Sequence, residues 1–359
     1  MSPYKVLILG ANGQLGQAFV KALSTPSGLS LGGVFSCADE LRQDSCLRTD
    51  GALRRDGSLV TLQPISMISL VGPSQGGLDL SNSERLREYL HQHKPNLVIN
   101  AAAYTAVDQA EQEADLAYQI NAHALECIAQ ALTHWQGKLI HFSTDYVFGA
   151  DAVTSTRPYV LRSETDKPGP VNTYGASKLA GEQAILESGV EALIVRTSWL
   201  YAAHGNNFML TMRQLMQSRE VLNVVDDQWG VPSSVDFLLE HTLALWQQGA
   251  RGLVHVVPDG ACTWYEYAQV IASELVALGE SLTLKTLQPM AYAEYRQLIN
   301  KKMAERPYDV VLDNRRLKQF LAPTIRPERM GDNQVRIPIS TWQAELKRVL
   351  RTLYPSASA

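Results

Sequence analysis

Lys5-Val-Leu-Ile-Leu-Gly-Ala-Asn-Gly-Gln-Leu-Gly16 is the stretch of sequence that decides the fold. A short apolar run leads into three glycines, at positions 10, 13 and 16, and then into a helical pattern that ends before Pro26. Glycine lets a pyrophosphate approach the N–H groups at the start of such a helix, because no Cβ blocks the way. The spacing is G-x-x-G-x-x-G rather than the commoner G-x-G-x-x-G, so a tight turn without a ligand stays an alternative.

Apolar runs of similar length recur along the first 200 residues, with helix-length segments between most of them. This alternation predicts an α/β fold with a doubly wound parallel sheet, Rossmann-like, and a smaller C-terminal substrate-binding lobe. We expect a dinucleotide-binding domain over 1–200, with an insertion at about 27–63, and a substrate lobe mainly over 201–359, some segments of which return to the first domain. The expected sheet strands are 5–10, 65–71, 96–103, 138–143 and 192–197, and the expected later elements are 207–217, 235–248, 253–257, 264–278 and 340–353.

Composition excludes several classes of protein. The 359 residues are 45% hydrophobic and 19% charged with a net charge of -4, which is typical of a folded globular protein without a general attraction for nucleic acid or anionic lipid. Four dispersed cysteines form neither a disulfide framework nor a CxxC metal pair, and they favour a reducing compartment. The sequence shows no secretory signal pattern and no apolar run near the ~20 residues that span a bilayer, so we expect a cytoplasmic protein.

Tyr174-Gly-Ala-Ser-Lys178 opens a segment with helical spacing that runs to Glu187. Residues four apart share one face of a helix, so the phenol and the ammonium are predicted to be neighbours. Because a nearby ammonium stabilises a phenolate, we expect Lys178 to lower the pKa of Tyr174 from its ordinary value of about 10. Tyr174 can then pass a proton to a carbonyl oxygen. In isolation this pattern arises easily by chance, and an ordinary exposed helical face is the alternative.

Ser143, Thr144 and Asp145 come at the expected carboxyl end of a strand, where ligands of doubly wound sheets bind. A hydroxyl at this place can donate a hydrogen bond to the same carbonyl oxygen that Tyr174 would protonate. The combination favours a catalytic site over the alternative, which is a polar turn that leaves the strand.

The second expected strand lacks the acidic residue that usually grips the ribose of NAD, because Val71 and Gly72 stand at its carboxyl end. The preference between NADH and NADPH therefore stays open. Asp79 and Leu80 follow as the expected contact on the adenine side, although Asp79 could equally cap a helix that begins near Ser83.

These segments together resemble the extended short-chain dehydrogenase/reductase family, and the likeness extends over nearly the whole chain. It rests on an ordered set of segments, namely 10–16, 98–108, 143–148, 172–182, 196–201, 205–208, 227–232, 263–267 and 306–307. The insertion at about 26–64 departs from compact members of the family. Ala18 stands where some members carry an acidic residue that helps to hold a metal at a dimer interface, so we predict no metal site.

The resemblance implies a role for each matching residue. Tyr174 would donate the proton, Lys178 would bind the nicotinamide ribose and tune Tyr174, and Thr144 would hydrogen-bond the reacting oxygen. Thr144 and Asp145 would contact the sugar. Trp199 would pack its flat face on the sugar ring, with a core tryptophan as the alternative. The cofactor site implied by the family and by the glycine turn comprises Gly10, Gly13, Gln14, Leu15, Gly16, Asp79, Leu80, Ala103, Tyr104, Thr105, Tyr174 and Lys178.

The activity implied by the resemblance is reduction of a nucleotide-activated keto sugar with NADPH or NADH. The implied reaction turns the C4 keto group of dTDP-4-dehydro-6-deoxy-L-mannose into the hydroxyl of dTDP-L-rhamnose. The expected partner is this small nucleotide-sugar, without nucleic acid or membrane, and a homodimer stays open. The alternatives are a reductase of another nucleotide-sugar and a non-catalytic regulatory or binding subunit like that of methionine adenosyltransferase, which belongs to the same family.

Overall fold

A computed structural model of the chain describes residues 4–24, 52–53, 59–60, 65–70, 78–150, 159–299, 303–322 and 337–354. The chain forms two compact units. The first consists of Met1–Ser143, Ser177–Val195 and Trp246–Leu253, and the second of Thr144–Ala176, Arg196–Leu245 and Val254–Ala359. Each unit therefore combines segments that are far apart in the sequence.

A six-stranded sheet, most of which belongs to the first unit, has the strand order β13-β8-β6-β5-β1-β4. β1 pairs in parallel with β4 on one side and with β5 on the other, and β5 pairs in parallel with β6. The chain thus winds outward in both directions from β1, and the predicted doubly wound sheet is confirmed. The strands are β1 (Tyr4–Leu9), β4 (Ile65–Leu70), β5 (Leu97–Asn100), β6 (Lys138–Thr144), β8 (Glu191–Thr197) and β13 (Gly252–His255).

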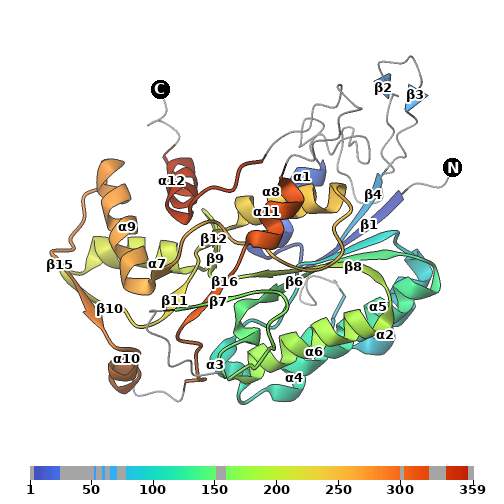
Figure 1. Cartoon of the computed structure of the whole chain (residues 1–359), viewed down its shortest axis with the longest axis horizontal. Coiled ribbons are helices and arrows are strands. Elements are labelled where there is room, and N and C mark those ends of the chain that lie inside the picture. The colour runs from blue at the N-terminus through green and yellow to red at the C-terminus, as the bar shows by residue number, and fades with distance from the viewer. Residues whose placement is uncertain are drawn as a thin grey trace. The chain divides into compact units, whose positions relative to one another are not determined.

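Helices cover both faces of this sheet. Leu15, Phe19 and Leu23 are buried at intervals of four residues, so one face of α1 packs inward. Figure 1 shows α2, α5 and α6 together along one face of the sheet and α1 on the other. Because helices cover both faces of the sheet, the strands are apolar along almost their whole length. In β1, for example, Val6, Leu7 and Ile8 are fully buried. The helices are α1 (Gln14–Ser24), α2 (Ser83–His93), α3 (Val107–Ala110), α4 (Ala114–Tyr118), α5 (Ala124–His134) and α6 (Thr173–Ser188), with a π-helical turn, η2 (Gln119–His123), before α5.

The insertion after α1 contains a small hairpin. β2 (Ala52–Leu53) and β3 (Leu59–Val60) pair antiparallel within it. Most of the insertion, together with Val71 and Gly72, lies outside the described residues.

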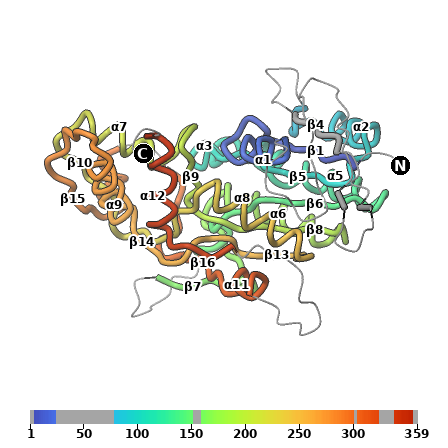
Figure 2. Tube along the Cα trace, turned by 90° about the horizontal axis from the view of Figure 1, so that it is seen from above, coloured from blue at the N-terminus to red at the C-terminus, as the bar shows by residue number. Residues whose placement is uncertain are grey.

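The second unit is built from helices and short strand pairs. α7 and α9 pack beside the parallel pair β10 and β15, as Figures 1 and 2 show. α9 begins at a capping box, in which the Thr263 hydroxyl accepts from the Glu266 N–H and the Glu266 carboxylate accepts from the Thr263 N–H. The elements are η3 (Asp145–Val147), β7 (Val160–Arg162), β9 (Leu200–Tyr201), α7 (Phe208–Ser218), β10 (Val221–Val225), β11 (Trp229–Gly230), β12 (Ser233–Ser234), α8 (Val235–Gln247), β14 (Cys262–Thr263), α9 (Trp264–Ala277), β15 (Thr286–Met290), α10 (Tyr292–Ile299), β16 (Val310–Leu312), α11 (Arg315–Leu321) and α12 (Trp342–Thr352).

The helices expected in the second half of the chain are all present as α7, α8, α9 and α12, within two residues of the predicted bounds. The functional division at residue 200 stays a prediction, because the two units reflect packing and not ligand binding. Among the helices of the described residues, none combines the length and apolar composition that a bilayer crossing needs.

Gly16→Ala is expected to destabilise the first unit. A Cβ at this position would lie 2.1 Å from the backbone oxygen of Gly10, which cannot move without opening the turn. We expect a loss of about 2 kcal/mol or more in the free energy of unfolding, as in other overpacked sites. Urea unfolding followed by circular dichroism measures this loss.

Gly13→Ala is the matched control in the same turn. Its Cβ would lie 3.3 Å from the same oxygen, a much milder contact. We expect it to lose less than about 1 kcal/mol, and equal losses in the two variants would contradict the assignment of Gly16 to the fold.

Candidate active site

Two of the three glycines after β1 are required by backbone packing. Gly10 has a φ of +78°, and a Cβ there would lie 2.6 Å from the amide nitrogen of Ala102. At Gly16 a Cβ would lie 2.1 Å from the carbonyl oxygen of Gly10, so no side chain fits there. Gly13, in contrast, is exposed and makes only a mild predicted contact. Gly13 is therefore the glycine whose bare backbone is open to a ligand.

The first turn of α1, all of which the structure describes, carries no acidic side chain. The free N–H groups at such a terminus attract an anion. Gln14 is half-buried there, whereas the Leu15 side chain is buried. Leu15 can therefore take part in cofactor binding only through its backbone.

Ala103, Tyr104 and Thr105 follow β5 and are half-buried to exposed. Asn121 holds the backbone of Tyr104: its amide oxygen accepts from the Tyr104 N–H at 2.9 Å, and its amide nitrogen donates to the Tyr104 carbonyl at 3.1 Å. The same nitrogen donates to the hydroxyl of Ser177 on α6 at 3.0 Å. Sequence reasoning did not identify Asn121, although an asparagine in an Ala-rich helical stretch is an available signal of a buried polar contact.

Asp79 and Leu80 precede α2. The Asp79 carboxylate accepts from both the N–H and the hydroxyl of Ser81, at 2.9 and 2.8 Å. The alternative role of Asp79 as the cap of α2 is wrong, because Asn82 is the N-cap and accepts from the Arg85 N–H at 3.0 Å. Leu80 packs into the hydrophobic core. Contact of these two residues with the adenine side of the cofactor stays a prediction.

In the second unit, the buried residues Thr144 and Asp145 and the half-buried Tyr174 form a polar cluster. Thr144 donates to the Asp145 carboxylate at 3.1 Å and shares a hydrogen bond with the Tyr174 hydroxyl. The Thr144 hydroxyl also accepts from the Tyr146 N–H at 3.2 Å, and this bond caps the turn η3. Tyr146 and Tyr174 meet edge to face, with their ring centroids 5.6 Å apart. The structure thus brings together three residues that the sequence predicted for one site.

Gly175 explains how α6 reaches this turn. A Cβ at Gly175 would lie 2.1 Å from the carbonyl oxygen of Tyr146, so only glycine permits the approach. Asn172 caps the start of the helix by accepting from the Gly175 N–H at 2.7 Å. The two contacts position Tyr174 in the first turn of α6.

Burial controls the electrostatics of the cluster. It raises the pKa of Asp145 to about 7, against a weaker opposing effect of its hydrogen bonds to Thr144 and the backbone. Burial likewise raises the pKa of Tyr174 to about 12, with a further rise from Asp145 and an opposing effect of Thr144. The expected lowering of the Tyr174 pKa is therefore wrong for this structure. Tyr174 is held in its phenol form near neutral pH, which is the form that donates a proton.

Lys178 lies one turn after Tyr174 on α6 and belongs to the first unit. It is 2% exposed, and its amino group donates to the Phe142 carbonyl of β6 at 2.7 Å. The same nitrogen lies 3.2 Å from Nε2 of His141. Burial lowers the pKa of Lys178 to about 8, although Glu182 opposes this shift. These contacts explain why the lysine does not act on Tyr174 in the expected way: its amino group is directed to β6.

Trp199 has a φ of +43°, which is strained for a bulky side chain. Its indole stacks on that of Trp264, with centroids 3.5 Å apart and planes 9° from parallel. A Cβ on Gly230 would lie 2.3 Å from the Trp199 ring. Trp264 therefore covers one face of Trp199 in this structure. Packing of Trp199 on a sugar stays a prediction.

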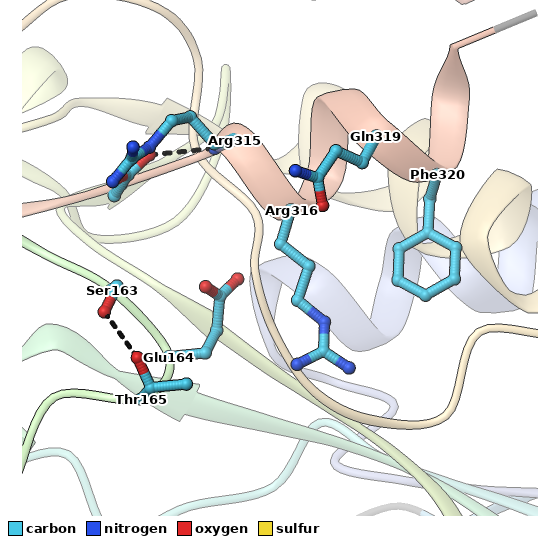
Figure 3. Close-up of a pocket in the computed structure, with 8 residues that line it drawn as sticks. Ser163, Glu164, Thr165, Arg315, Arg316, Gln319 and Phe320 are labelled. Carbon is cyan, nitrogen blue, oxygen red and sulfur yellow. Dashed lines mark hydrogen bonds and ion pairs between the residues drawn. The ribbon is translucent and has the colours of Figure 1, made fainter.

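A pocket of about 580 Å³ lies in the second unit, on the loop after β7 and the helix α11 (Figure 3). Its charges are mixed: Arg315 pairs with Asp313, and Glu164 lies across from Arg316. This balance offers little net attraction for the phosphates of a nucleotide. Its lining residues lie outside the predicted site, and they are Ser163, Glu164, Thr165, Asp313, Arg315, Arg316, Gln319 and Phe320.

Comparison with known proteins shows the family. The family model of the RmlD substrate binding domain matches residues 4–354. The chain belongs to this family. The match to the RmlD substrate binding domain includes every predicted site residue, from Gly10 to Trp199.

Named members of the family are similar to this chain over most of their length. A dTDP-4-dehydrorhamnose reductase from Escherichia coli strain K12 is 36% identical over 285 residues, which cover 78% of this chain and 87% of that protein. The crystal structure of a dTDP-4-dehydrorhamnose reductase from Clostridium acetobutylicum matches with a TM-score of 0.73 at 29% identity, over 97% of this chain and 99% of that one. The dTDP-4-dehydrorhamnose reductase from Bacillus anthracis, solved in complex with NADP, matches with a TM-score of 0.70 at 30% identity, over 98% and 100% of the two chains.

Asp145→Asn is expected to stabilise the protein in a pH-dependent way. The folded protein keeps Asp145 protonated up to about pH 7, whereas the unfolded chain ionises it near 3.8, so native stability falls as the pH rises between these values. The variant lacks this cost. Its advantage in free energy of unfolding should be absent at low pH and reach at most about 4 kcal/mol above pH 7. Denaturant unfolding across this pH range measures it.

Asp313→Asn provides a control of opposite sign. Burial raises the pKa of Asp313, but its hydrogen bonds from Arg315 outweigh burial and lower the value. Asp313 thus stabilises the folded protein at neutral pH and loses this effect as the pH falls. An Asp145→Asn variant that resembled Asp313→Asn would contradict the assignment.

Proposed function

We propose that this protein is an NADPH- or NADH-dependent reductase that converts the C4 keto group of dTDP-4-dehydro-6-deoxy-L-mannose into the hydroxyl of dTDP-L-rhamnose. The observation that carries the proposal is the hydrogen bond between the hydroxyls of Thr144 and Tyr174 at the carboxyl end of β6. Two hydroxyls that meet at such a point can both reach one carbonyl oxygen. The relatives named as reductases of this sugar support the choice of substrate.

Tyr174 supplies the proton in this reaction. When hydride reaches C4, the carbonyl oxygen becomes an alkoxide, which is a stronger base than a tyrosinate. Proton transfer from Tyr174 to that oxygen therefore runs downhill even with a raised phenol pKa of about 12. Thr144 stabilises the developing charge by hydrogen bonding. Below about pH 7 Asp145 is a neutral acid and can donate a hydrogen bond to a sugar hydroxyl.

The glycine turn fits a dinucleotide. Gly13 is exposed where α1 begins, and the first turn of that helix has no acidic side chain among its described residues. The pyrophosphate would lie at Gly13, Gln14 and Leu15, where α1 begins. The nicotinamide supplies the hydride when it is bound. Lys178 would bind its ribose, with Ala103, Tyr104 and Thr105 along the cofactor.

A reducing, cytoplasmic setting completes the proposal. Cys127 and Cys262 are buried free thiols, as expected in a reducing compartment. The activated sugar is the proposed partner.

Initial rates of nicotinamide oxidation with purified protein test the proposed reaction. With dTDP-4-dehydro-6-deoxy-L-mannose we expect steady turnover without a second protein and a product identified as dTDP-L-rhamnose by mass and NMR. Parallel runs with NADH and NADPH determine the cofactor preference. If only another nucleotide-sugar were turned over, the proposed substrate would be wrong. If no keto sugar were turned over, the alternative of a binding or regulatory subunit would be favoured.

Tyr174→Phe is expected to remove the proton donor and leave the ring in place. We expect kcat to fall by about 10²–10⁴-fold, the usual contribution of a positioned acid, with little change in NADPH affinity measured by fluorescence titration. Tyr265→Phe is the matched control, because its hydroxyl donates to the Leu287 carbonyl instead and Tyr265 has no predicted role in the site. Near-normal turnover in Tyr174→Phe would reject the assigned role.

A further inference from the structure

A chain of buried hydrogen bonds connects β5, β6 and α6 in the first unit. The Ala102 N–H donates to Asn100 Oδ1 at 3.2 Å, and Asn100 Nδ2 lies 3.2 Å from His141 Nδ1. On the far side of the ring, His141 Nε2 lies 3.2 Å from Lys178 Nζ. Asn100 and Lys178 are each 2% exposed and His141 is fully buried, so these groups are removed from bulk solvent and need partners within the protein.

The direction of each bond follows from what each group can do. A backbone N–H only donates, so the oxygen of the Asn100 amide must face Ala102 and its nitrogen must face His141. The amide nitrogen also only donates, so His141 Nδ1 is the acceptor. Burial, and secondarily Lys178, hold the pKa of His141 well below its ordinary value, so the ring is neutral and its single proton lies on Nε2.

This arrangement places an N–H of His141 directly against Lys178. An ammonium has three donors and no acceptor, so a charged Lys178 would face the Nε2–H donor to donor. An uncharged amine has a lone pair and accepts this bond, while it still donates to the Phe142 carbonyl. If the ring proton were on Nδ1, it would face the amide nitrogen of Asn100, again donor to donor. If the Asn100 amide were turned to avoid this, its nitrogen would face the Ala102 N–H, which is also a donor.

We propose that His141 is a positioning residue that presents its Nε2–H to Lys178 and so favours the uncharged amine of Lys178 over the ammonium. Glu182, one turn further along α6 and 1% exposed, acts in the opposite direction because its carboxylate favours the ammonium. Burial by itself lowers the pKa of Lys178 to about 8, and the Nε2–H of His141 acts in the same direction. The histidine thereby helps to keep the pKa of Lys178 low, so that this side chain can gain or lose its charge near pH 8.

The consequence for the reaction rests on the proposed function. If Lys178 acts as an ammonium during reduction, kcat/KM falls as the pH rises through the Lys178 pKa. His141→Gln can turn its amide oxygen toward Lys178 and accept from the ammonium, so the pKa should rise and activity should extend to higher pH. If His141→Gln disturbed packing alone, it would lower kcat without shifting the pH at which kcat/KM falls on the alkaline side.

Two NMR measurements test the proposal without substrate or cofactor. In native protein labelled with ¹⁵N-histidine, the nitrogen shifts of His141 should show the Nε2–H tautomer. In protein labelled with ¹³C,¹⁵N-lysine, the Lys178 signal, assigned by its loss in Lys178→Met, should titrate below the ordinary value of about 10.4. His141→Gln should raise this midpoint by about one unit or more, a tenfold change in the dissociation constant.

His241→Gln is the matched control, because His241 is 1% exposed and donates from Nδ1 to the Phe237 carbonyl of α8. It should leave the Lys178 midpoint unchanged. An Nδ1–H tautomer of His141, a native Lys178 midpoint near 10.4, or no rise in His141→Gln would each overturn the proposal. The tautomer is read in the native protein and so needs no folded variant. A protein that meets these NMR expectations but reduces no keto sugar would reject the proposed function alone.

Discussion

The hydrogen bond from the amino group of Lys178 to the carbonyl of Phe142 is the constraint on which the candidate site depends. A buried amino group without an acceptor would cost several kcal/mol, so the register between α6 and β6 is held at this point. Thr144 follows Phe142 by two residues on the strand, and Tyr174 precedes Lys178 by one turn of the helix. The bond therefore joins the strand that ends at Thr144 to the helix that carries Tyr174 in its first turn.

Glycines on α6 make this bond possible. A Cβ at Gly175 or at Gly181 would lie 2.1 Å from a backbone oxygen, that of Tyr146 in the first case and that of Asn121 in the second. Larger residues would push the helix away from both segments, and Lys178 would lose its reach. The pattern of a tyrosine, a lysine and two glycines therefore describes a helix that packs closely on other backbone segments in its first turn, at Gly175, and near its middle, at Gly181.

Much of the fold could be predicted from local pattern. The apolar runs gave strands where β1, β4, β5, β6 and β8 lie, because strands buried on both faces need near-continuous apolar sequence. The clustering of Thr144, Asp145 and Tyr174 was also predictable, because Thr144 and Asp145 lie at the end of a strand and Tyr174 lies at the start of a helix. Asn121 and His141 were missed, because single polar residues in apolar segments reveal their partners only when distant segments pack together.

The sequence by itself determined the order of strands and helices along the chain, the glycine turn and the pairing of Tyr174 and Lys178 on one helix, because these depend on residues close together in the chain. Only the tertiary structure decided the charges. Burial raises the pKa of Tyr174 and lowers that of Lys178, and the lysine is directed to β6. Helical spacing alone predicted a lowered tyrosine pKa, because it records which groups are neighbours but not how much water the fold removes from them.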